Sequence, residues 1–116
     1  MEKVYGVSQI VNYLKEFLAE DAFLDGLWLR GELSGYKSHH SGHWYFSLKD
    51  EAANLRCVMF RSYVPNVEFM PEDGMDVLVW GRISIYEKDG TCQLYAQELF
   101  PAGAGAQSLA LEQLKK

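Results

Sequence analysis

Long hydrophobic runs are absent from this sequence. Its 116 residues contain no stretch of about 18 or more consecutive apolar residues, so we expect no membrane-spanning helix and no membrane partner. The opening residues, MEKVYGVSQI, also lack the charged, apolar and small-residue regions of a secretory signal. A cytoplasmic location is therefore the expectation.

Cysteine is scarce, with two residues, Cys57 and Cys92, that lie far apart in strand-like stretches. Such cysteines in a chain without a secretory signal usually behave as small buried hydrophobic side chains. A zinc site would need ligands at closer spacing. The histidines His39, His40 and His43 gather in a glycine-flanked stretch, but no further ligand group is evident. We therefore expect no metal and no cofactor, and expect these histidines to contact phosphates or bases.

Catalytic motifs are missing as well. The chain contains no glycine-rich phosphate loop before a helix and no Ser-His-Asp arrangement within a supporting motif. Glu72, Asp73 and Asp76 fall in a turn, where solvated carboxylates are the usual finding. We predict that this chain binds a ligand and contributes no catalytic residue.

Cations are outnumbered, because 11 Lys and Arg residues face 16 Asp and Glu residues, for a net charge of −5. The charge is unevenly distributed. Residues 27–65 carry five cations against three anions, so the rest of the chain carries a net charge of −7. A locally basic face of this kind attracts a polyanion, although more weakly than a strongly basic domain does.

Hydrophobic residues make up 48% of the chain and aromatic residues 14%, enough for one compact domain with a core. Near the N-terminus, the spacing predicts an amphipathic helix that Ser8 caps and that ends near Glu20. We expect this helix to act as a lid on the core. Its apolar positions are Ile10, Val11, Leu14, Phe17 and Leu18.

From residue 27 onwards the hydrophobic period changes to two, which is typical of strands. The long connection between the third and fourth predicted strands, and Gly81 where a small closed barrel needs a bend, indicate a mainly β fold, a five-stranded OB-fold barrel. The alternation alone would also permit another small five-stranded barrel. The predicted strands span 27–34, 41–50, 55–61, 75–86 and 91–100, with a loop at 35–42.

The predicted elements divide the chain into three parts. Residues 1–26 form an N-terminal helical segment that packs on the barrel, and residues 27–100 form the OB-fold domain that binds nucleic acid. Residues 101–116 begin with the stretch PAGAGA, read as a hinge, and continue into the start of a C-terminal helix. We expect this helix to continue beyond Lys116 in a longer protein.

The stretch SGHWYFSLKD, residues 41–50, alternates between a core-like side and a side that holds a ring and a cation. In an OB-fold, the second and third strands and their flanking loops form the ligand face, where rings stack on unpaired bases and cations contact phosphates. Alternatively, Tyr45 and Phe60 pack beneath the helix or the linker, and Lys49 pairs with one of the two acidic residues that follow it. We assign Trp44, Phe46 and Leu48 to the core, and to the nucleic-acid face Tyr45, Lys49, Arg56, Phe60, His43, Ser47, Lys37 and Arg61.

Seven stretches carry a resemblance to a known family: VSQIVNYLKEFL, LWLRGELS, SGHWYFSLKD, LRCVMFR, PEDGMDVLVWGRISIYE, QLYAQELFPAG and LEQLKK. In this order and at this spacing they resemble the N-terminal domain of the exodeoxyribonuclease VII large subunit. SGHWYFSLKD and CVMFR are the most distinctive pieces. The chain is similar, more loosely, to the OB-type anticodon-binding domains of class II aminoacyl-tRNA synthetases.

The resemblance implies a two-subunit bacterial nuclease that hydrolyses single-stranded DNA from either end to short 5′-phosphorylated oligonucleotides, without a strict need for a divalent metal. It assigns substrate binding to the N-terminal OB domain. It assigns catalysis to a following region, whose long helices bind the small subunits. Single-stranded DNA and the small subunit are therefore the expected partners.

Two stretches depart from the pattern of this family. After Arg61 relatives are usually rich in arginine, whereas this chain reads SYVPNVEFMPEDG. The loop between the fourth and fifth strands often carries Pro-Arg-Gly, whereas this chain reads EKDG. Both departures remove phosphate contacts, so we expect weaker and less salt-sensitive binding than in relatives.

Two other functions stay open at this point. The acidic net charge, together with Trp28 and Trp80, which we expect to be exposed, would suit an OB module that docks a protein or another copy of itself. The looser similarity would suit an OB domain that binds RNA in the manner of an anticodon-binding domain.

Overall fold

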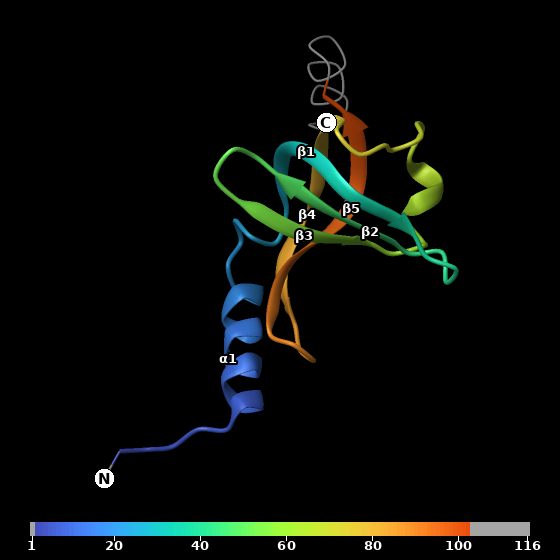
Figure 1. Ribbon diagram of the computed structural model, residues 1–116. Helices are drawn as coiled ribbons and strands as arrows, with labels where there is room; N and C mark the ends of the chain where they lie inside the picture. Colours follow the sequence, from blue (N-terminus) through green and yellow to red (C-terminus); the bar gives the residue numbers. More distant parts are fainter. Residues whose placement is uncertain (1, 103–116) are drawn as a thin grey trace.

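The computed structural model describes residues 2–102. These residues form one helix, five strands and a short 3-10 turn (Figure 1). The predicted hinge and C-terminal helix from residue 103 onwards lie outside the described residues. The elements are α1 (Val7–Ala19), β1 (Leu27–Ser38), β2 (Trp44–Lys49), β3 (Asn54–Met59), η1 (Val64–Asn66), β4 (Asp76–Tyr86) and β5 (Thr91–Pro101).

The five strands close into a barrel in the order β1-β2-β3-β5-β4. Strands β3 and β5 pair in parallel, and every other neighbouring pair is antiparallel. The long connection between β3 and β4, which contains η1, makes this parallel pairing possible. This arrangement confirms the predicted mainly β barrel and its OB-fold strand plan.

The core lies inside the barrel and is built from one side of each strand. Phe46 and Leu48 are buried as predicted, whereas Trp44 at the start of β2 is half-buried and packs edge-on against Tyr36. Alternate residues of the strands point inward, and side chains of the β3–β4 connection, among them Val64, Val67 and Phe69, pack against the core. The buried cluster consists of Leu33, Phe46, Leu48, Cys57, Met59, Val77, Val79, Leu94, Ala96 and Leu99.

The two cysteines differ in environment. Cys57 is buried in the core, and burial raises the pKa of its thiol to about 12, so the thiol is protonated at neutral pH. Cys92 is exposed. The prediction that both are buried is therefore wrong for Cys92, because this residue lies beside the tip of the β4–β5 hairpin, which extends past the barrel (Figure 1).

Strand β1 is longer than predicted. It continues through the expected loop 35–42 as far as Ser38, and its register against β2 shifts between Ser34 and Lys37. Gly35 lies within this bulge with a φ of 63°, a conformation that glycine adopts without strain. The prediction of a loop from glycine content was therefore wrong for residues 35–38. The bulge places Lys37 opposite Tyr45 on β2.

Gly81 marks the predicted bend in β4. The pairing with β5 shifts register between Trp80 and Gly81. A Cβ atom at position 81 would collide with the carbonyl oxygen of Tyr95, so the two backbones approach too closely for any side chain. The structure confirms that a glycine at this point lets the long strand bend around the barrel.

Helix α1 begins at Val7, two residues earlier than a cap at Ser8 would allow. Gly6 is the N-cap, and its backbone N–H donates to Oε1 of Gln9 at 2.7 Å. Ser8 lies inside the first turn, so the prediction that it caps the helix is wrong. The helix ends at Ala19, close to the predicted end. No helix within residues 2–102 has the length and apolar content needed to cross a membrane.

The helix does not act as a lid on the core. It projects from the barrel and lies beside the β4–β5 hairpin, where Nζ of Lys15 is 3.0 Å from Oε1 of Glu87 (Figure 1). No residue of α1 is buried, and none belongs to the core cluster. The predicted lid is therefore wrong, because the strands and the β3–β4 connection cover the core without the helix.

Candidate nucleic-acid interface

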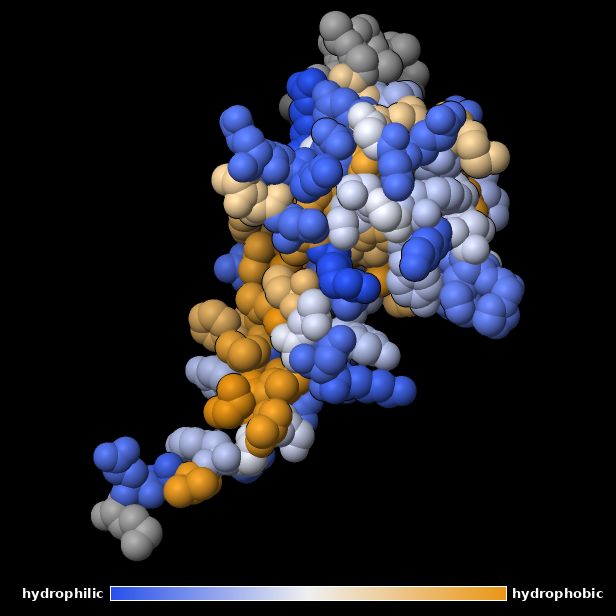
Figure 2. Space-filling model, in the orientation of Figure 1, coloured by the Kyte–Doolittle hydropathy of each residue, from blue (hydrophilic) through white to orange (hydrophobic). Residues whose placement is uncertain are grey.

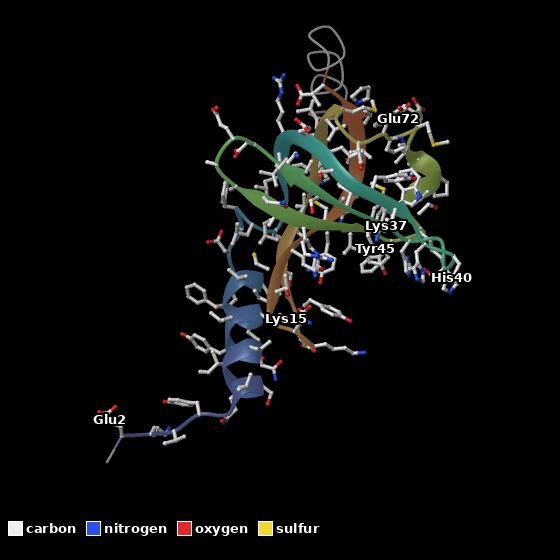
Figure 3. All side chains as sticks on the ribbon, in the orientation of Figure 1. Glu2, Lys15, Lys37, His40, Tyr45 and Glu72 are labelled. Carbon is white, nitrogen blue, oxygen red and sulfur yellow. The ribbon has the colours of Figure 1, made fainter. Side chains whose placement is uncertain are left out.

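A groove of about 540 Å³ opens on the outer surface of the barrel. Five of the eight predicted site residues line it, from three neighbouring strands and the turn after β3. These five are Lys37, Tyr45, Ser47, Arg56 and Phe60. Figure 3 shows Lys37 and Tyr45 side by side, as their pairing between β1 and β2 requires.

The register of the strands explains why these side chains meet. Tyr45 on β2 lies opposite Val58 on β3, which lies opposite Tyr95 on β5. In the next row, Ser47 on β2 lies opposite Arg56 on β3. Residues directly opposite one another in a sheet point to the same face, so each row forms part of one surface. Lys37 at the end of β1 extends the first row, because it lies opposite Tyr45. The groove therefore runs from the end of β1 across β2 and β3 to β5.

Aromatic rings line much of the groove. The rings of Phe60 and Tyr95 stack at 5.8 Å with an interplanar angle of 27°, and burial raises the pKa of the Tyr95 phenol. Tyr45 is 36% exposed and Phe60 is 41% exposed. The alternative in which these two rings pack beneath the helix is therefore wrong. Both rings are partly exposed to a ligand in the groove.

Positive charge in the groove comes from Lys37 and Arg56. The guanidinium carbon of Arg82 lies 5.7 Å from the centre of the Tyr95 ring and brings a third cation close by. A carboxylate is also present, because Asp89 of the β4–β5 turn lines the groove. Hydrogen bonds from Thr91 hold the pKa of Asp89 below its usual range, and the charge of Arg56 contributes further. The groove is therefore only weakly positive.

Three predicted site residues do not line the groove. Lys49 lies at the far end of β2, where its Nζ is 3.6 Å from a carboxylate oxygen of Glu32 on β1. The ion-pair partner of Lys49 therefore lies on the neighbouring strand. The backbone N–H of Arg61 donates to Nδ1 of His43 at 2.9 Å. The His43 ring in turn meets Phe60 edge-on at 5.4 Å, so His43 contacts a ring of the groove without lining it.

The other two histidines belong to the turn between β1 and β2. Nδ1 of His39 lies 2.8 Å from the hydroxyl of Ser41, and the rings of His39 and His40 are 4.1 Å apart. The His39 ring meets Tyr45 edge-on at 5.9 Å. Within residues 2–102, no group of three or more His, Cys, Asp or Glu side chains is placed to hold a metal ion.

Comparison with known proteins agrees with this geometry. The family model of the OB-fold nucleic acid binding domain matches residues 5–99. The chain belongs to this family. A solved structure described as a replication protein A heterotrimer bound to ssDNA shares the fold of this OB-fold domain, with a TM-score of 0.59 and 11% identity over 81% of this chain and 70% of that chain.

Close sequence relatives of the OB-fold domain are named exodeoxyribonuclease 7 large subunit. The relative from Ruminiclostridium cellulolyticum is 48% identical over 116 residues, which are 100% of this chain and 29% of the relative. The relative from Natranaerobius thermophilus is 50% identical over 115 residues, 99% of this chain and 27% of the relative. These relatives confirm the resemblance found in the sequence. The chain spans less than a third of their length.

The fifth strand is the part of the interface that sequence reasoning missed. It contributes Gln93 and Tyr95 to the groove, and the hairpin before it contributes Tyr86 and Asp89. A signal was present, because Leu94 and the alanine that follows Tyr95 point inward, which leaves Gln93 and Tyr95 outward. The prediction assigned the face to the second and third strands and the loops that flank them, and so overlooked the contribution of the fifth strand through the parallel β3–β5 pairing.

The tryptophans expected to be exposed are engaged with each other. The rings of Trp28 and Trp80 lie 5.6 Å apart, and Trp28 lies 6.1 Å from the ring of Phe100. Both tryptophans are half-buried in this cluster on β1, β4 and β5. They therefore offer less free aromatic surface than the sequence suggested.

Proposed function

We propose that this OB-fold domain binds single-stranded DNA in the groove that runs from the end of β1 across β2 and β3 to β5. The observation that carries the proposal is the open Phe60–Tyr95 ring pair with Lys37 and Arg56 in the same groove. The names of the sequence relatives, which describe exodeoxyribonucleases, support it. Further support comes from the fold shared with replication protein A, whose structure was solved bound to ssDNA.

The groove suits unpaired nucleotides for a physical reason. Bases of a single strand can leave their neighbours and stack on Tyr45, Phe60 and Tyr95, at roughly 1–3 kcal/mol per base. In a duplex the base faces are already occupied, so the rings gain nothing. Lys37 and Arg56 contact the phosphates between stacked bases, and these contacts tolerate any sequence.

We further propose that the domain serves a nuclease of the exodeoxyribonuclease VII type. In a protein as long as the relatives, residues 1–26 would be a helical attachment to the barrel, residues 27–100 the DNA-binding unit and residues 101–116 the link to a catalytic region. That region would hydrolyse phosphodiester bonds and release short 5′-phosphorylated oligonucleotides in the cytoplasm. The small subunit would bind outside this chain.

The test compares two lysines that differ in position. Lys37 lines the groove, whereas Lys49 pairs with Glu32 outside it. Fluorescence anisotropy with a labelled oligothymidine, at a series of salt concentrations, measures affinity for each variant. We expect Lys37→Ala to weaken binding several-fold and to reduce the slope of log affinity against log salt by about 0.7.

The matched variant Lys49→Ala should change neither the affinity nor the slope by much. Equal losses in the two variants would show that the DNA does not lie in the groove. A folded RNA that displaces the oligothymidine at lower concentration than a second DNA strand does would favour an RNA-binding function instead.

A further inference from the structure

Helix α1 carries a continuous apolar stripe that the barrel leaves uncovered. Ile10 is 44% exposed, Tyr13 63%, Leu14 42% and Phe17 62%. Their spacing of three and four residues places them on one face of the helix. Figure 2 shows hydrophobic side chains gathered along the helix, and the rings of Tyr13 and Phe17 stack at 6.2 Å.

The barrel contacts a different side of the helix. Val11, Lys15 and Leu18 are the half-buried positions of α1, and they too follow helical spacing. Val11 faces Gly90 of the β4–β5 turn, and Lys15 pairs with Glu87. An isolated helix of this length is marginal in water, so its stability depends on covering its apolar face. Contact with one hairpin covers only part of that face.

The charges beside the stripe are all negative. Glu16 follows Tyr13 by three positions and Glu20 follows Phe17 by three positions, so both carboxylates border its open edge. Lys15, the one cation between Val7 and Gly26, is turned to the hairpin and paired there, against four carboxylates in the same stretch. A ligand on the stripe therefore meets an apolar surface with an acidic margin.

We propose that this stripe binds an amphipathic helix of a partner protein. That helix carries its own apolar stripe, bordered by lysine or arginine side chains. Apolar anchors at positions i, i+3, i+4 and i+7 are the means by which one helix recognises another. Opposite charges at the margin then select the partner and fix its orientation.

The acidic margin argues against the other surfaces that an exposed apolar helix could bind. In a pair of identical copies, the charges bordering both stripes would be carboxylates, which repel. An anionic lipid surface repels the same carboxylates, since helices that lie on membranes carry lysine and arginine on their polar face. Nucleic acid is disfavoured for the same reason. This inference stands independently of the DNA-binding groove, because the stripe uses none of the residues that line it.

Two synthetic helical peptides test the proposal. Both carry the same leucine stripe, and the flanking residues are lysine in one and glutamate in the other. Isothermal titration calorimetry with the full chain should show binding of the lysine peptide at least about tenfold tighter than the glutamate peptide. The double variant Leu14→Ser with Phe17→Ser should lose this binding, whereas Asn12→Ser on the other side of the helix should retain it.

Charge reversal tests the margin itself. Glu16→Lys combined with Glu20→Lys should reverse the preference, so that the glutamate peptide binds more tightly. Lysine-peptide binding that survives the two serine substitutions would overturn the proposal, as would no binding of either peptide. Two further results would overturn the proposal. The first is self-association of the unchanged chain, seen by light scattering and abolished by the two serine substitutions. The second is sedimentation of the unchanged chain with vesicles of phosphatidylcholine and phosphatidylglycerol. Circular dichroism confirms that each variant keeps its fold, which is expected because every substituted side chain is exposed.

Discussion

At the scale of single residues, the groove combines groups that attract DNA with one that opposes it. Lys37 and Arg56 attract phosphates, and the carboxylate of Asp89 repels them. Because hydrogen bonds from Thr91 lower the pKa of Asp89, this carboxylate stays charged at neutral pH and through mild acidification. We therefore expect the Asp89 carboxylate to weaken DNA binding at neutral and mildly acidic pH. Few sequence patterns could reveal this, since an Asp in a turn is ordinarily a solvated turn residue.

Replacing Asp89 with Asn should tighten binding of an oligothymidine several-fold at low salt, because the amide keeps an oxygen that accepts from Thr91 and loses the charge. The gain should shrink as salt rises, since screening weakens the repulsion. The control is Asp50→Asn, whose carboxylate accepts from the backbone N–H groups of Ala52 and Ala53 in a turn outside the groove. An equal gain in both variants would point to the net charge of the protein as the cause.

Phe60 should contribute more than any cation in the groove. Its ring is 41% exposed and stacks on Tyr95, so Phe60→Ala removes one platform for a base. We expect a loss of roughly 1–3 kcal/mol in binding to single-stranded DNA, with little change in salt dependence. Phe23→Ala removes an equally large exposed ring beside α1 and should leave affinity unchanged. Anisotropy titrations of both variants distinguish stacking in the groove from nonspecific contact with exposed rings.

At the scale of elements, what could be predicted depended on how local the cause is. Strand β4 and the buried side of β2 follow from alternation, and the bend at Gly81 follows from a glycine within a strand. The extension of β1 depends on pairing with β2, which a glycine-rich stretch alone does not reveal. The position of α1 depends on whether the barrel leaves a face to cover. Whether such a face exists is a property of the folded barrel. The amphipathic spacing of the helix alone does not show it.

The bend in β4 makes a prediction about stability. In Gly81→Ala the new methyl group meets the backbone of Tyr95 and Ala96, neither of which can rotate away. We expect the free energy of unfolding to fall by about 1–3 kcal/mol, as for other overpacked sites. Gly35→Ala meets no atom within 4 Å but must hold a φ of 63°, so its cost should be about 1 kcal/mol. Urea denaturation of both variants measures the two costs.

At the scale of the whole molecule, the two proposed surfaces use different elements. The groove spans the end of β1 together with β2, β3 and β5, whereas the apolar stripe lies on α1, which projects beside the β4–β5 hairpin (Figure 1). With a net charge of −5, the chain as a whole repels DNA, so the rings of the groove must supply much of the affinity. We therefore expect single-stranded DNA to bind with a shallow salt dependence and to be preferred over the corresponding duplex. A competition titration with both forms measures this preference.

The most direct test of the account is a map of where an oligothymidine touches the protein. Amide chemical shifts, followed by nuclear magnetic resonance as the oligonucleotide is added, report each residue separately. We predict that the largest shifts fall on Tyr45, Phe60 and Tyr95, with α1 unaffected. Shifts confined to Trp28 at the other end of β1 and Trp80 on β4, with the groove unchanged, would contradict the account.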